Sequence, residues 1–338
     1  MKLLITGGAG FIGSHLTDAL LKQGDEVTII DDLSTGCMGN FEHVRNYPNF
    51  HFVIESITNE TVMDRLVSEC DMIYHLASAV GVQLIVNRPV EVIERCVMGT
   101  HAVLKIANRY KKKTLITSTS EIYGKNENVP FSEEDDRILG PTTRSRWSYS
   151  CSKAIDEFLA LAHHKEMGLP VVIVRLFNTI GPRQTGQYGM VVPRFIGQAL
   201  KQEPLTVYGS GSQSRCFCNV VDVVRALIDL MDCEDANGEI VNVGTQYEIS
   251  ILDLAKRVRK ITESNSKIEY IKYDEAYEIG FEDMKRRIPS VDKIRSLIGW
   301  QPQIELDDSL RSIAGEIRAQ SHADKDFAKN KNAEMVAL

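Results

Sequence analysis

A tyrosine and a lysine four residues apart, Tyr149 and Lys153, have the types and the spacing of a catalytic base. Residues at this spacing share one face of a helix, and apolar residues recur at helical spacing through 150–167. An ammonium beside a phenol favours the phenolate and so lowers the pKa of the tyrosine. A phenolate near neutral pH can remove a hydroxyl proton while hydride leaves the same carbon. The pair therefore predicts hydride-transfer chemistry.

Three glycines near the N-terminus predict where a dinucleotide binds. Gly7, Gly10 and Gly13 form a G-x-x-G-x-x-G motif between an apolar strand-like run and a helical pattern. Glycines in this context permit a tight turn and a close approach to pyrophosphate, which the helix N-terminus then binds. Asp31 and Asp32 end the next predicted strand, where an acid can bind a ribose hydroxyl. Because an acid there repels a 2′-phosphate, we expect NAD and not NADP.

The elements that position these residues alternate between strands and helices. Such alternation predicts βαβ units, and hence an α/β fold with a Rossmann doubly wound parallel sheet. After Phe177 the pattern changes to glycine, proline and short elements, which predicts a smaller mixed α/β substrate domain. The expected strands are 2–6, 26–30, 72–75, 114–117, 171–175 and 205–207, and the expected helices are 13–23, 90–109, 150–167, 192–201 and 221–231.

These patterns suggest a division of the chain into two domains and a tail. We expect an NAD-binding domain at 1–177 with returning segments near 216–245, and a mainly substrate-binding domain at 178–315. The polar residues 319–338 are expected to form a flexible tail.

Composition narrows the classes of function. The chain has 338 residues, 43% of them hydrophobic, and a net charge of −7, which argues against a nucleic-acid partner. No run of 18 apolar residues occurs, so no membrane span is expected. Seven cysteines without a disulfide framework suit a reducing, cytoplasmic location. Cys216 and Cys218 have no matching pair at zinc-like spacing, so no metal site is expected.

Several motifs together resemble the extended short-chain dehydrogenase/reductase family, the NAD-dependent epimerases and dehydratases. The resemblance spans roughly residues 1–315. It implies a tightly held NAD(P) cofactor and a nucleotide-linked sugar as substrate. The motifs are GGAGFIG (7–13), HLAS (75–78), TSEIYG (119–124), YSCSK (149–153), RLFNTIGPRQ (175–184), EPLTVYGSGSQSRCF (203–217) and RRIPS (286–290).

The resemblance also assigns roles to individual residues. Thr119 is implied as the hydroxyl partner of Tyr149, Arg215 and Arg287 as ligands of the sugar-nucleotide diphosphate, and Asn178 as a contact of the nucleotide. Substrate contacts are also expected at Ser120 and Arg146. Further implied cofactor contacts are Phe11, Ile12, Ser56, Ile57, Leu76 and Ala77.

Glu121 narrows the reaction within the family. Sugar 4-epimerases usually lack a carboxylate at this position of the motif, whereas UDP-glucuronate decarboxylases and some 4,6-dehydratases have it. The stretch 198–217 and the pattern RWSYSCSK (146–153) both resemble decarboxylases, so UDP-glucuronate decarboxylation to UDP-xylose is the leading hypothesis. A 4,6-dehydratase, a 4-epimerase and a non-catalytic NAD-binding scaffold remain alternatives.

Three positions depart from the family pattern. Ser56 stands where an aspartate usually contacts adenine, and Cys96 replaces a common asparagine. Ser150 follows the tyrosine, where an acidic residue is usual in UDP-xylose synthases. The first two bear on contacts with the cofactor, and the third bears on the substrate.

An apolar stripe on the tyrosine-bearing helix predicts a homodimer. The family usually pairs this helix and a neighbour across a two-fold axis, and the stripe would then be buried in a four-helix bundle. Its residues are Ala154, Ile155, Phe158, Leu159 and Ala162.

Overall fold

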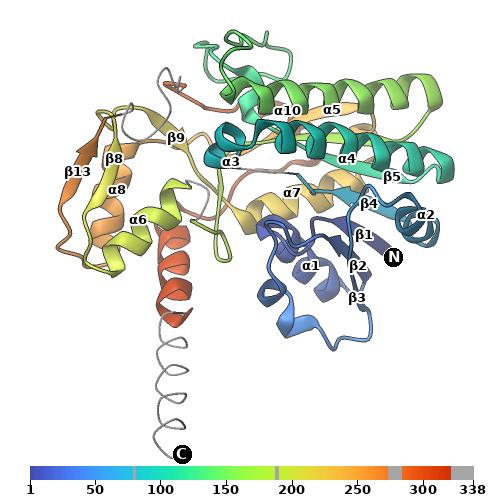
Figure 1. Ribbon diagram of the computed structural model, residues 1–338, viewed down its shortest axis with the longest axis horizontal. Helices are drawn as coiled ribbons and strands as arrows, with labels where there is room; N and C mark the ends of the chain where they lie inside the picture. Colours follow the sequence, from blue (N-terminus) through green and yellow to red (C-terminus); the bar gives the residue numbers. More distant parts are fainter. Residues whose placement is uncertain (79–80, 187–189, 273–283, 321–338) are drawn as a thin grey trace, which may run out of the picture.

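A parallel sheet lies at the centre of the larger part of the molecule (Figure 1). The structure, a computed structural model, describes residues 1–78, 81–186, 190–272 and 284–320. Within these residues the sheet has seven strands in the order β11-β6-β5-β4-β1-β2-β3. The strands are β1 (Lys2–Thr6), β2 (Glu26–Asp31), β3 (Phe50–Ile54), β4 (Met72–His75), β5 (Lys113–Thr119), β6 (Val171–Leu176) and β11 (Glu239–Val243).

Helices cover both faces of this sheet, as the strand–helix alternation predicts. Each face buries apolar strand residues against helices, which gives two separate hydrophobic cores. The helices on one face are α1 (Phe11–Gln23), α7 (Val220–Asp232) and α10 (Asp292–Ile298). Those on the other are α2 (Glu60–Glu69), α4 (Pro89–Tyr110) and α5 (Arg146–Met167). The predicted Rossmann architecture is therefore confirmed.

The strand order places the candidate site at one edge of the sheet. The order reverses beside β1, and in such sheets ligands bind at the carboxyl ends of the strands near this point. Gly7 follows β1, Asp31 ends β2, and Thr119 ends β5, so all three meet at the same edge. Segments far apart in the sequence thus converge on one crevice.

A smaller unit with its own hydrophobic core lies beside the sheet, on the left of Figure 1. It contains the parallel pair β8–β13 and the antiparallel pair β9–β12. Its elements are α6 (Val191–Leu200), β8 (Leu205–Tyr208), β9 (Ser214–Cys216), β12 (Glu248–Ser250), α8 (Ile251–Ile261), β13 (Ile268–Ile271) and a helix over 306–320.

The chain crosses between the two units several times. α7 and β11 return to the large sheet, within the segment expected to return. α10 also returns, because Val291 and Ile294 are buried in the core that contains β1. The remaining short elements are β7 (Thr179–Ile180), β10 (Cys218–Asn219), α3 (Val82–Asn87), η1 (Met38–Asn40), η2 (Glu42–Val44), η3 (Ser120–Tyr123) and η4 (Glu234–Ala236).

Two further sequence expectations concern membranes and the C-terminus. Among the described residues, no helix combines the length and the apolar character needed to cross a bilayer. Residues 319 and 320 belong to the last described helix, and the rest of the predicted tail lies outside the described residues.

Candidate active site

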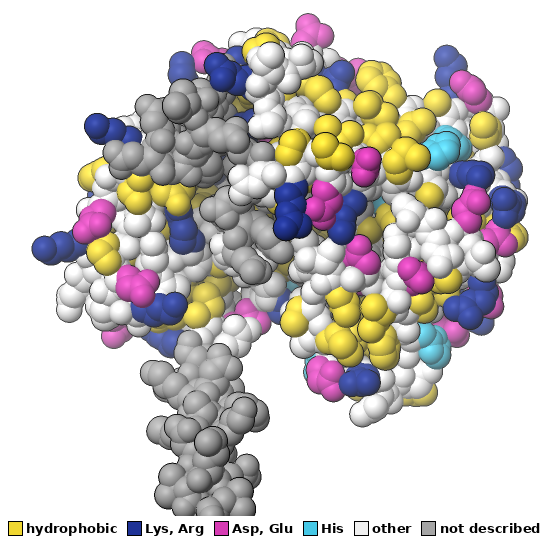
Figure 2. Space-filling model, in the orientation of Figure 1, with side chains coloured by type: hydrophobic (Ala, Val, Ile, Leu, Met, Phe, Trp, Pro, Cys, Tyr) yellow, Lys and Arg dark blue, Asp and Glu magenta, His cyan; other side chains and the backbone are white. Residues whose placement is uncertain are grey.

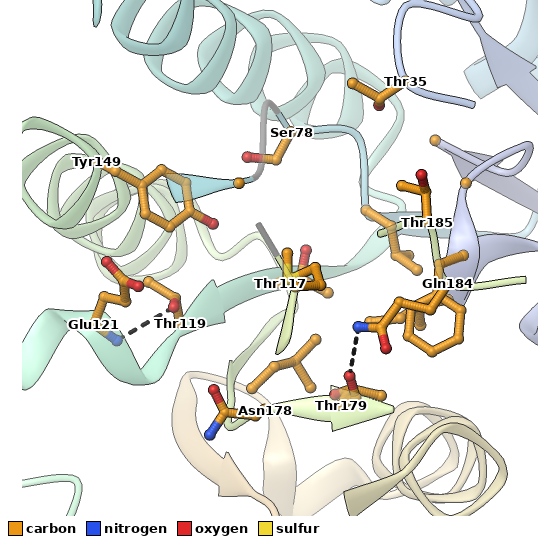
Figure 3. A pocket seen from close by; sticks show the side chains of 18 of the residues that line it. Thr35, Ser78, Thr117, Thr119, Glu121, Tyr149, Asn178, Thr179, Gln184 and Thr185 are labelled. Atoms are coloured by element: carbon orange, nitrogen blue, oxygen red, sulfur yellow. Dashed lines mark hydrogen bonds between the residues drawn. The ribbon is translucent and has the colours of Figure 1, made fainter. Parts of the chain in front are cut away.

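One pocket of about 500 Å³ opens at the carboxyl edge of the sheet and extends to the smaller unit. Figure 3 shows Tyr149, Thr119 and Glu121 together at one end and Thr35 and Thr185 at the other. The pocket is lined by every residue predicted for the site: Thr119, Glu121, Tyr149 and Lys153; Gly7, Gly10, Phe11, Ile12, Gly13, Asp31, Asp32, Ser56, Ile57, Leu76 and Ala77; and Ser120, Arg146, Asn178, Arg215 and Arg287.

The glycine turn fits a dinucleotide pyrophosphate. Gly7 has a φ of +73°, and a Cβ there would lie 2.7 Å from the backbone nitrogen of Ala77. Helix α1 begins after Gly10, which has no side chain that could cap the helix. The first turn of α1, residues 11–14, contains no acidic residue. The N–H groups and the positive end of the helix dipole are thus available to phosphate. A side chain at Gly13 would meet Gly8 at 2.8 Å, so glycine is required there as well.

Asp31 and Asp32 have different environments at the end of β2. Asp31 accepts hydrogen bonds from the backbone nitrogens of Ala9 (3.0 Å) and Leu33 (2.8 Å), which fixes its carboxylate beside the glycine turn. Burial raises the pKa of Asp31, and these hydrogen bonds oppose the rise. Asp32 instead lies 3.2 Å from the Arg95 guanidinium. Asp31 is therefore better placed to bind a ribose hydroxyl, and Arg95, which sequence reasoning missed, also lines the pocket.

The Tyr149 environment differs from the one predicted. Ser78 lies near its hydroxyl, while the Lys153 ammonium lies 2.9 Å from the Asp156 carboxylate. Burial raises the pKa of Tyr149 well above its ordinary value, and the Glu121 carboxylate adds to the rise. The sequence predicts a lowered pKa, and the direction differs chiefly because the hydroxyl is buried; Asp156, which pairs with Lys153, adds to the rise.

Glu121 lies between two arginines at the catalytic end of the pocket. Its Oε1 is 3.5 Å from a guanidinium nitrogen of Arg146 and 3.5 Å from one of Arg287. All three side chains are buried. Thr119 caps the short helix η3 by accepting a hydrogen bond from the Glu121 backbone nitrogen at 3.2 Å. The helix η3 therefore holds the acid next to the hydroxyl side chains of the site.

Arg287 lies near Glu121 and Ser120 in the pocket, and its implied contact with the diphosphate stays a prediction. Its Nη1 donates to Ser120 Oγ at 3.3 Å. The surrounding segment is fixed to Phe131, whose backbone pairs with Ile288 (2.8 Å) and Ser290 (2.7 Å). These backbone bonds fix the segment that carries Arg287 beside the pocket.

A further part of the pocket is lined by the smaller unit and by Asn178, which follows β6. Arg215 on β9 donates to the Ser214 carbonyl at 2.7 Å, and Asn178 donates to the Cys216 carbonyl at 3.0 Å. Arg194 on α6 lies with its guanidinium carbon 4.0 Å from the ring centre of Tyr208. Both Arg194 and Tyr208 line the pocket, and sequence reasoning missed both. Arg194 lies outside the recognised motifs, whereas Tyr208 belongs to the motif at 203–217, which was the available signal.

Ser78 was also missed as a site residue, although it belongs to the HLAS motif. It contacts both Tyr149 and the Cys96 thiol, which is 3.3 Å away. Its position after β4, in the stretch that faces the cofactor crevice, was the available signal.

The sheet order, the glycine turn and the tyrosine–lysine helix together define an extended short-chain dehydrogenase/reductase. A sequence model described as GDP-mannose 4,6 dehydratase matches residues 4–313. The chain belongs to this family of NAD-dependent epimerases and dehydratases, as the motifs predict.

Relatives and solved structures agree with this assignment. The chain is 42% identical to a UDP-N-acetyl-alpha-D-glucosaminuronate decarboxylase of Bacillus cytotoxicus, over 92% of this chain and 95% of the relative. It is 38% identical to UDP-glucuronic acid decarboxylase 1 of Xenopus tropicalis, over 94% of this chain and 72% of the relative. A UDP-glucuronic acid 4-epimerase of Bacillus cereus, solved with UDP-glucuronic acid and NAD, aligns with a TM-score of 0.85 at 30% identity and covers 95% of this chain and 100% of its own.

Proposed function

We propose that the protein is an NAD-dependent decarboxylase of a UDP-linked hexuronate, with UDP-glucuronate as substrate and UDP-xylose as product. The observation that carries the proposal is the buried Glu121 between Arg146 and Arg287 at the catalytic end of the pocket. Two guanidiniums around one carboxylate suit the binding of a further carboxylate, such as that at C6 of a hexuronate, better than the binding of a neutral hexose. The decarboxylases among its relatives support the same reaction.

Oxidation at the sugar C4 begins the proposed reaction. Tyr149 removes the proton from O4, and Lys153 stabilises the phenolate that acts as the base. The glycine turn and Asp31 would hold NAD, which would supply the hydride acceptor for C4 and the hydride donor that completes the reaction. Arg215 and Arg194 bind the nucleotide diphosphate from the smaller unit, which fixes the sugar against the catalytic end.

Loss of CO2 follows from the 4-keto group. The oxidised sugar is a β-keto acid, so the C5–C6 bond breaks and its electron pair passes into an enolate at C5, C4 and O4. Tyr149, now protonated, and Thr119 donate hydrogen bonds to that oxyanion. Arg146 and Arg287 orient the carboxylate, while Glu121 takes up part of their charge and so limits stabilisation of the group that must leave. A proton then adds at C5, and the net reaction consumes one proton and releases CO2.

The 2-N-acetylated hexuronate is a second candidate substrate. The relative of Bacillus cytotoxicus, which is 42% identical to this chain, is named as a decarboxylase of UDP-N-acetyl-alpha-D-glucosaminuronate. This likeness supports the N-acetylated hexuronate as a candidate. Both substrates have the same C6 carboxylate and C4 hydroxyl, so the roles proposed for the site residues are the same for either.

Mass spectrometry of the products tests the proposed function directly. The purified protein is incubated with UDP-glucuronate or with UDP-N-acetylglucosaminuronate. We expect a product lighter by CO2 from one of them, with UDP-glucuronate preferred. A product of unchanged mass indicates a 4-epimerase, and a product lighter by water indicates a dehydratase. Either result contradicts the proposal.

We also propose that two copies of the chain pair through α4 and α5. Hydrophobic side chains gather over these helices in Figure 2. Ile155 and Phe158 on α5 are 45% and 64% exposed, and Met98 on α4 is 56% exposed. A contiguous exposed apolar patch of this kind is typical of a protein–protein interface. The patch differs from the predicted stripe at Ala154, which is buried inside its own subunit.

A cytoplasmic location fits the cysteines. All seven are free thiols, and Cys216 and Cys218 are buried in adjacent short strands. Burial raises the pKa of Cys216 to about 12, so this thiol stays protonated and unreactive. We therefore propose a reducing compartment for the protein.

A further inference from the structure

A second buried acid, Asp156, contacts the catalytic lysine from the same helix. Its Oδ2 lies 2.9 Å from Lys153 Nζ, and the two side chains are 0% and 2% exposed. A fully buried carboxylate is costly unless a partner balances its charge. This acid lies outside the tyrosine–lysine motif, so the motif alone does not explain it.

Polar groups from the neighbouring elements complete the surroundings of this pair. The Thr100 hydroxyl of α4 faces the Asp156 carboxylate and lies 3.1 Å from His75 Nε2. His75 Nδ1 is in turn 2.8 Å from Thr6 Oγ1, at the end of β1. Burial lowers the pKa of His75 to about 3, so the imidazole is neutral. The Cys96 thiol also faces the site from α4. This chain of side chains joins the floor of the glycine turn to the catalytic helix.

The other described carboxylates near Lys153 have partners of their own. Glu157, the next residue on α5, forms two hydrogen bonds of 2.9 and 2.8 Å with the Arg175 guanidinium. Glu121 on η3 lies between the two arginines described above. Asp156 is thus the carboxylate that balances Lys153, and it raises the pKa of Lys153 although burial opposes this.

This charge balance acts on Tyr149. With Asp156 ionised, Lys153 and Asp156 sum to zero, and loss of the Tyr149 proton leaves a buried net charge of about −1, which a low-dielectric site disfavours. Without Asp156, loss of the Tyr149 proton would change the net charge of Tyr149 and Lys153 from about +1 to zero, which burial favours. Asp156 therefore makes the hydroxyl proton of Tyr149 harder to remove.

We propose that Asp156 is a positioning residue that holds the Lys153 ammonium and sets the pH at which Tyr149 becomes a base. The inference rests on the proposed function for the use of that base in oxidation at C4. It goes beyond that function because it assigns control of the pH profile to a residue outside the tyrosine–lysine motif.

The substitution Asp156→Asn tests the inference, since it removes the charge with little change in shape. Absorbance of tyrosinate is titrated in the purified protein, and the same titration of a Tyr149→Phe derivative is subtracted to isolate Tyr149. We expect the Tyr149 titration, and the acid limb of the kcat/KM profile, to move to lower pH by about one unit or more. Asp253→Asn is the matched control, because it breaks an exposed Lys256–Asp253 pair of the same spacing and the same 2.9 Å distance. It should shift neither curve.

An unchanged Tyr149 titration in a folded Asp156→Asn protein would overturn the inference and leave Asp156 with a structural role alone. If the asparagine variant does not fold, Asp156→Ser replaces it, since serine is smaller, is neutral and still accepts a hydrogen bond from Lys153. The tyrosinate titration needs no substrate. A shifted titration in a protein that releases no CO2 from either hexuronate would therefore reject the proposed function and retain the role of Asp156.

Discussion

Glu121 is the residue on which the choice of reaction depends. The resemblance separates epimerases from decarboxylases and dehydratases by this carboxylate, and the structure places it against Arg146 and Arg287. A carboxylate between two guanidiniums reduces their effective charge towards a bound anion. The proposed substrate carboxylate can thus be oriented without being held so tightly that CO2 loss slows.

Substitutions at Glu121 and Tyr149 should block different steps. We expect Tyr149→Phe to slow both NADH formation and product formation by about 10²–10⁴-fold, the usual contribution of a general base. Glu121→Gln should slow product formation by a similar factor while NADH still forms in a single turnover, because oxidation at C4 precedes the step that needs Glu121. Rapid-mixing absorbance of NADH and chromatography of the nucleotide sugar measure the two steps.

Glu127→Gln is the matched control for Glu121→Gln, because Glu127 forms an exposed ion pair with Lys285. It should leave both steps unchanged. Normal product yield from Glu121→Gln would mean that the reaction does not use this acid, as expected of a 4-epimerase.

Helices α4 and α5 serve both the site and the proposed dimer. One face of α5 carries Tyr149 and Lys153 into the pocket, and the opposite face exposes Ile155 and Phe158. A residue offset of three or four keeps each set on its own face of the helix. Pairing of two chains through this surface would therefore support α5 on the side opposite the pocket.

Charge in the exposed α5 face should separate the proposed dimer. We expect Phe158→Glu to give a monomer by light scattering at micromolar concentration, because it would place like charges in an apolar two-fold interface. Tyr270→Glu on β13, where the side chain is 58% exposed, is the control and should leave the mass unchanged. A monomeric mass for the unmodified protein would contradict the dimer proposal.

At the scale of the whole molecule, the pocket joins two units with separate hydrophobic cores. Asp31 and the glycine turn belong to the large sheet, whereas Arg215 and Arg194 belong to the smaller unit. A ligand that contacts both units stabilises their arrangement by mass action, by about 2.7 kcal/mol at a hundredfold excess over its Kd.

Thermal unfolding should distinguish NAD binding at the glycine turn from UDP binding at the smaller unit. We expect NAD and UDP each to raise the Tm, with NAD more effective than NADP because Asp31 repels a 2′-phosphate. Arg215→Ala should abolish the shift caused by UDP and retain the shift caused by NAD, and Asp31→Ala should do the reverse. Equal shifts from NADP and NAD would contradict the assigned cofactor preference.

The sequence determined the elements that have a strong local pattern. The strand at 72–75 is found at the predicted residues, and helix α4 differs from its prediction by one residue at each end, because apolar periodicity marks both segments. The edge strand β3 and the returning strand β11 were missed. β3 is partly exposed, and β11 includes Asn242, whose buried amide accepts a hydrogen bond from Tyr123 across the fold. A polar residue with a distant partner gives no local strand signal.

The sequence also determined which residue types gather at the site, since the glycine turn, Tyr149 and Lys153 are all recognisable from spacing alone. Only the tertiary structure decided how their charges pair. It placed Asp156 on Lys153, Glu121 between two arginines, and Arg287 at the catalytic end through backbone bonds to Phe131. The contacts of Glu121 and Arg287 join residues from different elements. The energies of all these contacts depend on burial and distance, neither of which can be deduced from the order of residues along the chain.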